Sequence, residues 1–169
     1  MLIDNYSEML WEIYTASFPP DERRSYNQQK EIMKNDKYNV IPYLSNNKLI
    51  GFLAYWDLTD FIFIEHFAFS SKMRGMGLGS KYLKEFLNKV HGQVILEVEP
   101  ISDDITLRRV GFYKRLGFEL NRYDYYQPPF DKSKEPVNLQ LMSYNKGLNH
   151  QEFQLIKEKL YKDVYEEIT

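Results

Sequence analysis

The sequence predicts a mixed α/β (α+β) protein in which one sheet carries helices on its faces. Three observations lead to this prediction. Two helical patterns open the chain, and three strand-like segments joined by turns follow them. A single strand–helix–strand crossover comes next, and a further helix and a terminal pair of strands complete the sheet. We therefore expect a single domain over residues 1–169, with a C-terminal helical extension over 149–169.

The first half of the chain predicts two helices and an antiparallel meander. Apolar residues recur at helical spacing from Tyr6 to Tyr14, and Pro19-Pro20 ends that helix because proline cannot continue it. Residues 21–24 form a charged turn, and Asn46-Asn47 between two apolar runs is typical of a hairpin turn. The expected elements are a helix that ends near Phe18, a helix over 27–34, and strands over 38–44, 48–56 and 61–69.

The second half predicts alternating helices and strands. Asp103 or Asp104 can cap the start of a helix, and Gly117 is placed to cap its end. The expected elements are helices over 80–90, 103–116 and 150–168, and strands over 94–98, 118–126 and 137–144. One stripe of the last helix is apolar and consists of Phe153, Ile156, Leu160, Val164 and Ile168. We expect this stripe to dock on the core, and a dimer contact is the alternative.

The composition alone excludes several classes of function. Lys and Arg number 22, and Asp and Glu number 24, so the chain lacks the basic field that nucleic-acid binding needs. The absence of cysteine excludes disulfides, thiolate metal sites and a cysteine nucleophile. No run approaches about 18 apolar residues, and the N-terminus does not resemble a signal peptide. We expect a cytoplasmic protein with no metal, no membrane span and no nucleic-acid partner.

The most informative segment is the run Arg74-Gly75-Met76-Gly77-Leu78-Gly79-Ser80, which stands between a strand-like segment and a helical one. Glycine can adopt positive φ and lets the backbone come close to a ligand. Successive backbone N–H groups at the start of a helix attract an anion, and the helix dipole adds to this attraction. The run therefore predicts a site for a pyrophosphate.

The residue types of this run also allow other interpretations. The dinucleotide-binding fingerprint G-x-G-x-x-G fits Gly75 and Gly77, with Glu97 at a plausible distance, but Ser80 stands where the third glycine belongs. The chain also offers one strand–helix–strand unit, whereas a doubly wound fold needs several. The phosphate-transfer loop G-x-x-x-x-G-K-[ST] is absent. A glycine-rich turn without a ligand is the remaining alternative.

Two motifs resemble those of the GNAT acetyltransferase superfamily. The run 74–79 is similar to the family's R/Q-x-x-G-x-G/A motif, and residues 65–73 resemble the strand and bend that precede it. Further along, residues 111–118, which read Gly-Phe-Tyr-Lys-Arg-Leu-Gly-Phe, are similar to its FYxxxGF signature. The resemblance covers roughly residues 38–145 and implies a GNAT-like fold with a central, mostly antiparallel, splayed sheet flanked by helices. The family's first strand would be the very short Leu2-Ile3 or would be missing.

The resemblance implies that the chain binds acetyl-coenzyme A as a co-substrate. The pyrophosphate would lie on backbone N–H groups of residues 74–80, with Arg74 assisting the phosphates or bracing the loop. The pantetheine arm would pair like an added strand beside the main chain of Phe67, Ala68 and Phe69. In the helix that ends at the second motif, Thr106 and Arg109 stand where the family often has asparagine and alanine. Coenzyme-binding candidates on this helix are Thr106, Arg109, Phe112 and Tyr113.

Direct acetyl transfer requires that the amine lose a proton, that the oxyanion be stabilised and that the leaving thiolate be protonated. Tyr113 matches the family's tyrosine near the coenzyme sulfur. A phenol has an ordinary pKa of roughly 10, so it can donate a proton at neutral pH. We assign Tyr113 as the general acid, and simple packing beside Phe112 is the alternative.

Three carboxylates are candidates for the general base. Glu65, on the strand that leads to the glycine run, is the first choice, and Glu97 and Glu99 on the next strand are the second. The alternative for Glu65 is a structural role, capping the strand or pairing with an arginine. His66 is expected to be a packed or surface residue.

The resemblance implies an N-acetyltransferase that acts on a primary amine of a small molecule or peptide, as a monomer or a homodimer. A non-catalytic sensor or scaffold that binds acyl-coenzyme A is the alternative. The acceptor pocket would draw on aromatic side chains, which are Trp11, Tyr14, Trp56, Phe61, Tyr125 and Tyr126.

Overall fold

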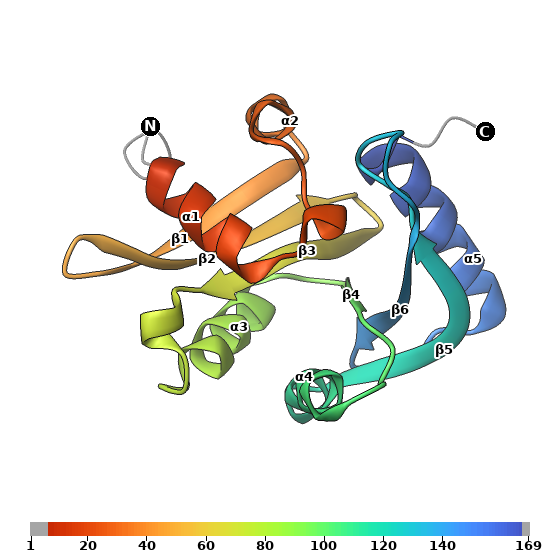
Figure 1. Ribbon diagram of the computed structural model, residues 1–169. Coiled ribbons are helices and arrows are strands. Elements are labelled where there is room, and N and C mark those ends of the chain that lie inside the picture. Colours follow the sequence, from red (N-terminus) through yellow and green to blue (C-terminus); the bar gives the residue numbers. More distant parts are fainter. Residues whose placement is uncertain (1–6, 167–169) are drawn as a thin grey trace. The chain divides into compact units, whose positions relative to one another are not determined.

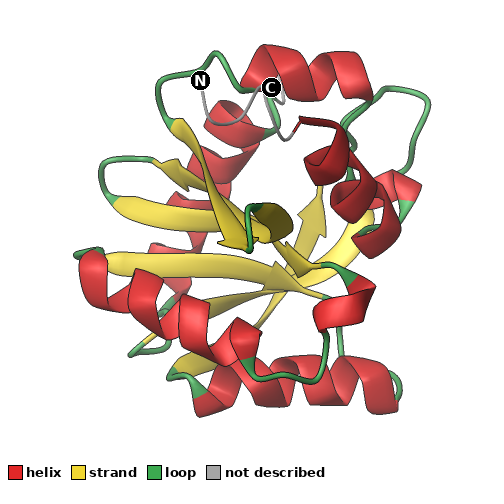
Figure 2. Cartoon of the chain, turned by 90° about the vertical axis from the view of Figure 1, so that its left-hand side faces the viewer, coloured by secondary structure: helices red, strands yellow, loops and turns green. Residues whose placement is uncertain are grey.

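The computed structural model describes residues 7–166. Figure 1 labels its elements, and Figure 2 separates helices, strands and loops by colour. The helices are α1 (Ser7–Ser17), α2 (Tyr26–Ile32), α3 (Leu78–Lys89), α4 (Asp104–Arg115) and α5 (His150–Lys159). The strands are β1 (Tyr38–Ser45), β2 (Lys48–Asp57), β3 (Phe61–Phe69), β4 (Gln93–Val98), β5 (Phe118–Gln127) and β6 (Val137–Tyr144).

The predicted fold class and element order are confirmed. The strands form one sheet in the order β1-β2-β3-β4-β6-β5, and the β1–β2, β4–β6 and β5–β6 pairings are antiparallel. The last predicted helix differs, because α5 ends at Lys159 and a π-helical turn over Leu160–Val164 follows it. The possible strand at Leu2-Ile3 and the stripe residue Ile168 lie outside the described residues. In the described part of the chain, no helix combines the length and apolar character that a membrane crossing requires.

The chain divides into two compact units, which we describe one at a time. The first comprises Met1–Asp57 and Ile64–His91, and the second comprises Leu58–Phe63 and Gly92–Thr169. The boundary falls within β3, so this strand contributes to both units. A single domain over residues 1–169 stays a prediction.

The first unit begins its sheet with the predicted hairpin. Ser45 pairs with Lys48, so Asn46 and Asn47 form a two-residue loop with φ of 50° and 61°. Positive φ at both positions is the geometry that matches the twist of paired strands, and asparagine tolerates it. The hairpin prediction from Asn46-Asn47 is therefore confirmed.

Helices α1 and α3 cover opposite faces of the strands in the first unit (Figure 1). Phe52 of β2 contacts Tyr14 of α1, with ring centroids 6.4 Å apart. Tyr55 of the same strand contacts Phe86 of α3 at 5.0 Å. Residues an odd number apart on a strand point to opposite faces, so the two contacts define an α1 face and an α3 face.

The second unit has the same plan, with α4 on one face and α5 on the other. Phe118 of β5 contacts Tyr113 of α4 at 5.7 Å, whereas Tyr125 of β5 contacts Phe153 of α5 at 6.4 Å. Phe118 pairs with Tyr144 and Tyr125 pairs with Leu139 across β6. Because 139 and 144 differ by an odd number, these pairs lie on opposite faces. The expected apolar stripe docks here, since Phe153, Ile156, Leu160 and Val164 are all buried.

Candidate active site

The glycine run forms an exposed turn that leads into α3. The short 3-10 turn over Ser71–Met73 ends at Arg74, and Gly75 and Gly77 then adopt φ of +78° and +72°. Gly77 is the N-cap of α3 and offers no side chain to the helix start. The first bond within the helix runs from the Lys81 N–H to the Gly77 carbonyl, at 3.2 Å.

This geometry leaves backbone donors available at the start of α3. The N–H groups of Leu78, Gly79 and Ser80 precede the first bonded N–H, as at any helix start. A Cβ built at Gly75 or Gly77 would meet no atom within 4 Å, so the glycines are needed for their positive φ and the space around them is open. The side chain of Met76 is exposed. The run fits a phosphate group on these grounds.

The end of β3 is fixed by close packing on β2. A Cβ at Gly51 would lie 2.4 Å from the Phe69 ring and 2.7 Å from the Ala68 carbonyl oxygen, so glycine is required there. The Phe69 ring also stacks on Tyr43 of β1, with centroids 5.7 Å apart, and on Tyr82 of α3 at 5.8 Å. Phe67 contacts Phe69 at 5.4 Å. The strand therefore enters the glycine run from a rigid aromatic cluster.

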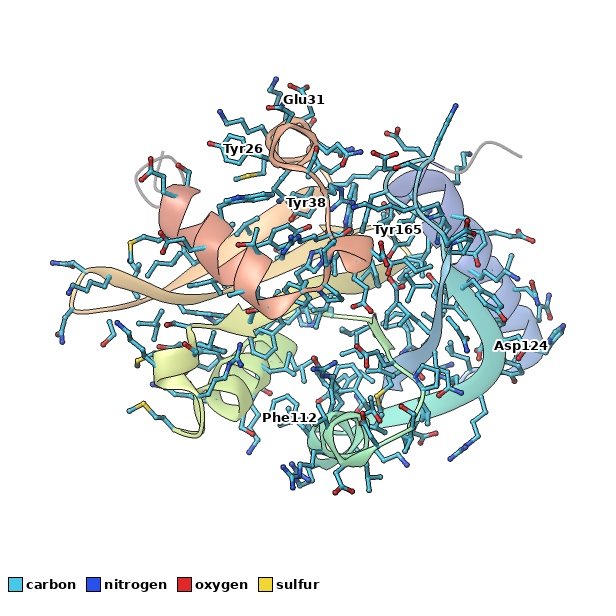
Figure 3. The ribbon with its side chains drawn as sticks, in the orientation of Figure 1. Tyr26, Glu31, Tyr38, Phe112, Asp124 and Tyr165 are labelled. Atoms are coloured by element: carbon cyan, nitrogen blue, oxygen red, sulfur yellow. The ribbon has the colours of Figure 1, made fainter. Side chains whose placement is uncertain are left out.

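The helix α4 begins with a capping box that uses Thr106. The Asp103 carboxylate accepts a hydrogen bond from the Thr106 N–H at 2.8 Å, and the Thr106 hydroxyl accepts one from the Asp103 N–H at 3.1 Å. Thr106 is buried in this cap. Arg109 lies one turn further on, partly exposed, 3.4 Å from a carboxylate oxygen of Glu99. Phe112, labelled in Figure 3, is half-buried on the same helix.

Tyr113 lies on the α4 face of the second unit. Its ring packs between Phe112 and Phe118, with centroid distances of 5.1 Å and 5.7 Å. Burial raises the pKa of its phenol to about 12, against a smaller opposite effect of Arg109. Tyr113 therefore stays protonated at neutral pH, as a proton donor must.

Glu65 forms a buried ion pair in the first unit. Its two carboxylate oxygens accept hydrogen bonds from Nη1 and Nη2 of Arg24, both at 2.7 Å. The side chains of Arg24 and Glu65 are 5% and 2% exposed. Burial alone would raise the pKa of Glu65, but the Arg24 charge and the nearby His66 lower it to about 2.

Two aromatic rings and a histidine surround the Arg24–Glu65 ion pair and hold it in place. The Arg24 guanidinium lies over the rings of Tyr38, labelled in Figure 3, and Trp56, each 5.9 Å away. Nδ1 of His66 is 3.4 Å from a Glu65 oxygen, and Nε2 is 3.1 Å from the Glu22 carbonyl. His66 was expected to be a packed or surface residue, and it is buried. Sequence reasoning assigned Arg24 only to a charged turn and missed its burial.

Glu97 and Glu99 were predicted together as carboxylates of one strand, but their surroundings differ. Glu97 pairs with Leu141 across β4 and β6, which places it on the α5 face. Its carboxylate is half-buried and accepts a hydrogen bond from the Tyr165 hydroxyl. Glu99 follows the end of β4, and its side chain is 39% exposed beside Arg109.

Most of the aromatic residues expected to line the acceptor pocket belong to the core. Tyr14, Trp56, Phe61 and Tyr125 are buried, and Tyr14 accepts a hydrogen bond from the Arg24 N–H at 2.7 Å. Tyr126 alone among the expected residues of the second unit is exposed, at 52%. These four side chains therefore serve packing rather than recognition.

The element order and the single six-stranded sheet define an α+β protein, and its glycine run opens a helix after β3. Residues 3–118 match the model of the acetyltransferase (GNAT) family. The chain belongs to the GNAT family and is an N-acetyltransferase.

One solved structure supports this assignment, and two more distant ones share the fold. A GNAT-family acetyltransferase from Bacteroides thetaiotaomicron is 30% identical, with a TM-score of 0.88 over 96% of this chain and 93% of that one. The aminoglycoside 6'-N-acetyltransferase from Enterococcus faecium shares the fold at 15% identity, with a TM-score of 0.56 over 83% and 90% of the two chains. A GNAT acetyltransferase from Elizabethkingia anophelis with acetyl-CoA bound has 16% identity and a TM-score of 0.52 over 77% and 93%. No match was found among the curated proteins.

Proposed function

We propose that the protein transfers an acetyl group from acetyl-coenzyme A directly to a primary amine of a small molecule or peptide. Binding of the acetyl donor is supported chiefly by the start of α3. There Gly75 and Gly77 have positive φ, and the space around them is open. The run Arg74–Ser80 receives the pyrophosphate on its backbone N–H groups. The structure of the acetyltransferase from Elizabethkingia anophelis, which has acetyl-CoA bound, supports this choice of donor.

Tyr113 is the proton donor in this proposal. A phenol that stays protonated at neutral pH can give its proton to the thiolate that leaves when the C–S bond breaks. Phe112 and Phe118 hold its ring in place. Arg109 and Thr106 contribute charge and helix capping rather than chemistry.

Glu97 is the carboxylate that takes the amine proton. Its side chain is half-buried on the α5 face, and its Oε1 accepts a hydrogen bond from the Tyr165 hydroxyl. Glu65 suits this role less, because a carboxyl with a pKa of about 2 and 2% exposure is a weak and inaccessible base. We assign Glu65 to the structural role of holding Arg24, and Glu99 to a surface pair with Arg109.

The overall proposal is tested by mixing the protein with acetyl-coenzyme A and a panel of amines, polyamines and peptides, and measuring free thiol. We expect thiol release that depends on one class of amine. Tight binding of the coenzyme without thiol release across the panel would contradict the proposal and favour a non-catalytic binding module.

The donor site has its own test in two variants of equal size. Asparagine and aspartate both tolerate the positive φ of Gly77 and both can cap a helix, but they differ in charge. Calorimetry should give at least about tenfold weaker coenzyme binding for Gly77→Asp than for Gly77→Asn, with a smaller ratio at high salt. Equal affinities would place the pyrophosphate elsewhere, and NAD serves as the negative control ligand.

A further inference from the structure

The middle of the glycine run is exposed, and packed elements lie at its two ends. Residues 74–77 are exposed, and a Cβ at Gly75 or Gly77 would meet no atom within 4 Å. On one side of the run, β3 ends at Phe69. On the other side, Tyr82 lies near the start of α3. The geometry of the run therefore depends on how these two ends are held relative to each other.

Aromatic rings join the two ends directly. The rings of Phe69 and Tyr82 are stacked, with centroids 5.8 Å apart and an angle of 21° between their planes. Tyr43 of β1 stacks on both of them, at 5.7 Å and 11° from Phe69 and at 4.1 Å and 22° from Tyr82. Three nearly parallel rings, from β1, β3 and α3, thus close the loop that contains the run.

The sheet side of this stack is tightly held. Tyr43 is buried and pairs with Gly51 of β2. The Phe69 ring fills the space over Gly51, where a Cβ would lie 2.4 Å from it. Tyr82 therefore places the start of α3 against a strand end that is already fixed.

We propose that Tyr82 is a positioning residue for coenzyme A, which sets the distance between the strand end that receives the pantetheine arm and the helix start that receives the pyrophosphate. This inference rests on the proposed function and adds a residue to its donor site. A ligand that carries both groups needs both ends in register, whereas a ligand that uses one end does not. The ring stack therefore favours the whole coenzyme over either of its parts.

The expected effect on binding follows from the populations of the free protein. When the two ends are in register in only a fraction of the molecules, the apparent affinity for coenzyme A falls by that fraction. The stacking energy of an aromatic pair is enough to change such a fraction about three- to tenfold. The N–H groups of Leu78, Gly79 and Ser80 belong to α3 and move with it, so a site for an isolated diphosphate stays intact.

The decisive variant is Tyr82→Leu, which keeps an apolar side chain and removes the ring. We expect it to weaken coenzyme A binding about three- to tenfold in calorimetry. Binding of ADP and of pantetheine, the two isolated parts, should weaken less than about twofold in NMR titrations. Tyr82→Phe keeps the ring and should bind coenzyme A like the wild type.

The matched control is Tyr55→Leu. Tyr55 is also half-buried and also joins the sheet to α3, through a contact with Phe86 at 5.0 Å, further along the helix. This control should leave coenzyme A binding at the wild-type value. Unchanged binding in Tyr82→Leu, equal weakening of coenzyme A and its two parts, or an equal loss in Tyr55→Leu would each overturn the inference.

Hydrogen exchange in the free protein tells failure of the inference apart from failure of the proposed function. The N–H groups of Met73 and Lys81 are both hydrogen-bonded, one on each side of the run. They should exchange faster in Tyr82→Leu than in the wild type, and not in Tyr55→Leu. Unchanged exchange overturns the inference even if the enzyme acetylates amines. Absence of thiol release by the wild type, with the exchange difference present, overturns the acetyl transfer instead.

Discussion

Glu65 in the first unit and Glu97 in the second are strand carboxylates held in opposite ways. Glu65 is clamped by the two nitrogens of a buried arginine, and its pKa is lowered to about 2. Glu97 is half-buried and accepts a hydrogen bond from a neutral phenol. A buried cation cancels the charge of a carboxylate and makes it a brace, whereas a phenol hydroxyl orients a carboxylate without adding a charge. The partner thus decides the role more than the position on a strand does.

The largest effect that would test this comparison is on stability. Arg24→Met leaves the Glu65 carboxylate buried without its cation, which should lower the free energy of unfolding by about 3–5 kcal/mol. Urea unfolding measures this loss. The double variant Arg24→Met with Glu65→Met should recover most of it, and Lys34→Met, which breaks an exposed pair with Glu31, should cost at most about 0.5 kcal/mol. A small effect of Arg24→Met would end the interpretation of Glu65 as a brace.

The second effect is on activity and should show the reverse pattern. Glu97→Gln should lower kcat roughly 10²- to 10⁴-fold while the melting temperature stays near that of the wild type, because a general base is lost but the amide oxygen can still accept the hydrogen bond of Tyr165. Glu65→Gln should instead lower the melting temperature, with kcat per folded molecule within a few-fold of the wild type. Steady-state kinetics and thermal unfolding of both variants measure the two effects. A large loss of kcat in Glu65→Gln, with little loss in Glu97→Gln, would restore Glu65 as the base.

The third effect is a pH dependence of stability that belongs to Glu65. Its pKa is about 2 in the folded protein and 4.5 ordinarily, so the folded state favours the ionised form. The corresponding stability, about 3 kcal/mol, is present above pH 4.5 and is lost as the pH falls toward 2. Urea unfolding at a series of pH values should show this loss. It should be missing in the double methionine variant, where no carboxylate remains to titrate.

The smallest effect should come from Glu99. Its side chain is 39% exposed and pairs with Arg109 at 3.4 Å, so Glu99→Gln should change stability by less than about 0.5 kcal/mol and kcat by less than about threefold. A loss as large as that of Glu97→Gln would show that the Tyr165 contact does not distinguish the two carboxylates.

The sequence was sufficient where local chemistry decides the structure. The alternating apolar residues of 61–69 and 137–144 predicted β3 and β6 at their observed bounds. Asn46-Asn47 predicted a hairpin that requires positive φ twice, and the glycine run predicted the turn into α3. Each of these signals lies within about ten residues of chain.

The parts that the sequence could not predict depend on distant partners. Arg24 and Glu65 are 41 residues apart, and Glu97 and Tyr165 are 68 apart, so no local pattern reports either contact. The π-helical turn was missed for a different reason. The stripe from Phe153 to Val164 is the same for a continuous α-helix and for one that widens after Lys159.

Tyr113 and Glu97 occupy opposite faces of the second unit, one beside α4 and the other beside α5. This separation has a consequence for engineering. Phe130 and Tyr165, which lie close to Glu97 or to each other, come after the family match ends at residue 118. A library restricted to the loop over 128–136 and the segment over 160–166 should therefore yield enzymes with new amine preferences and unaltered coenzyme affinity.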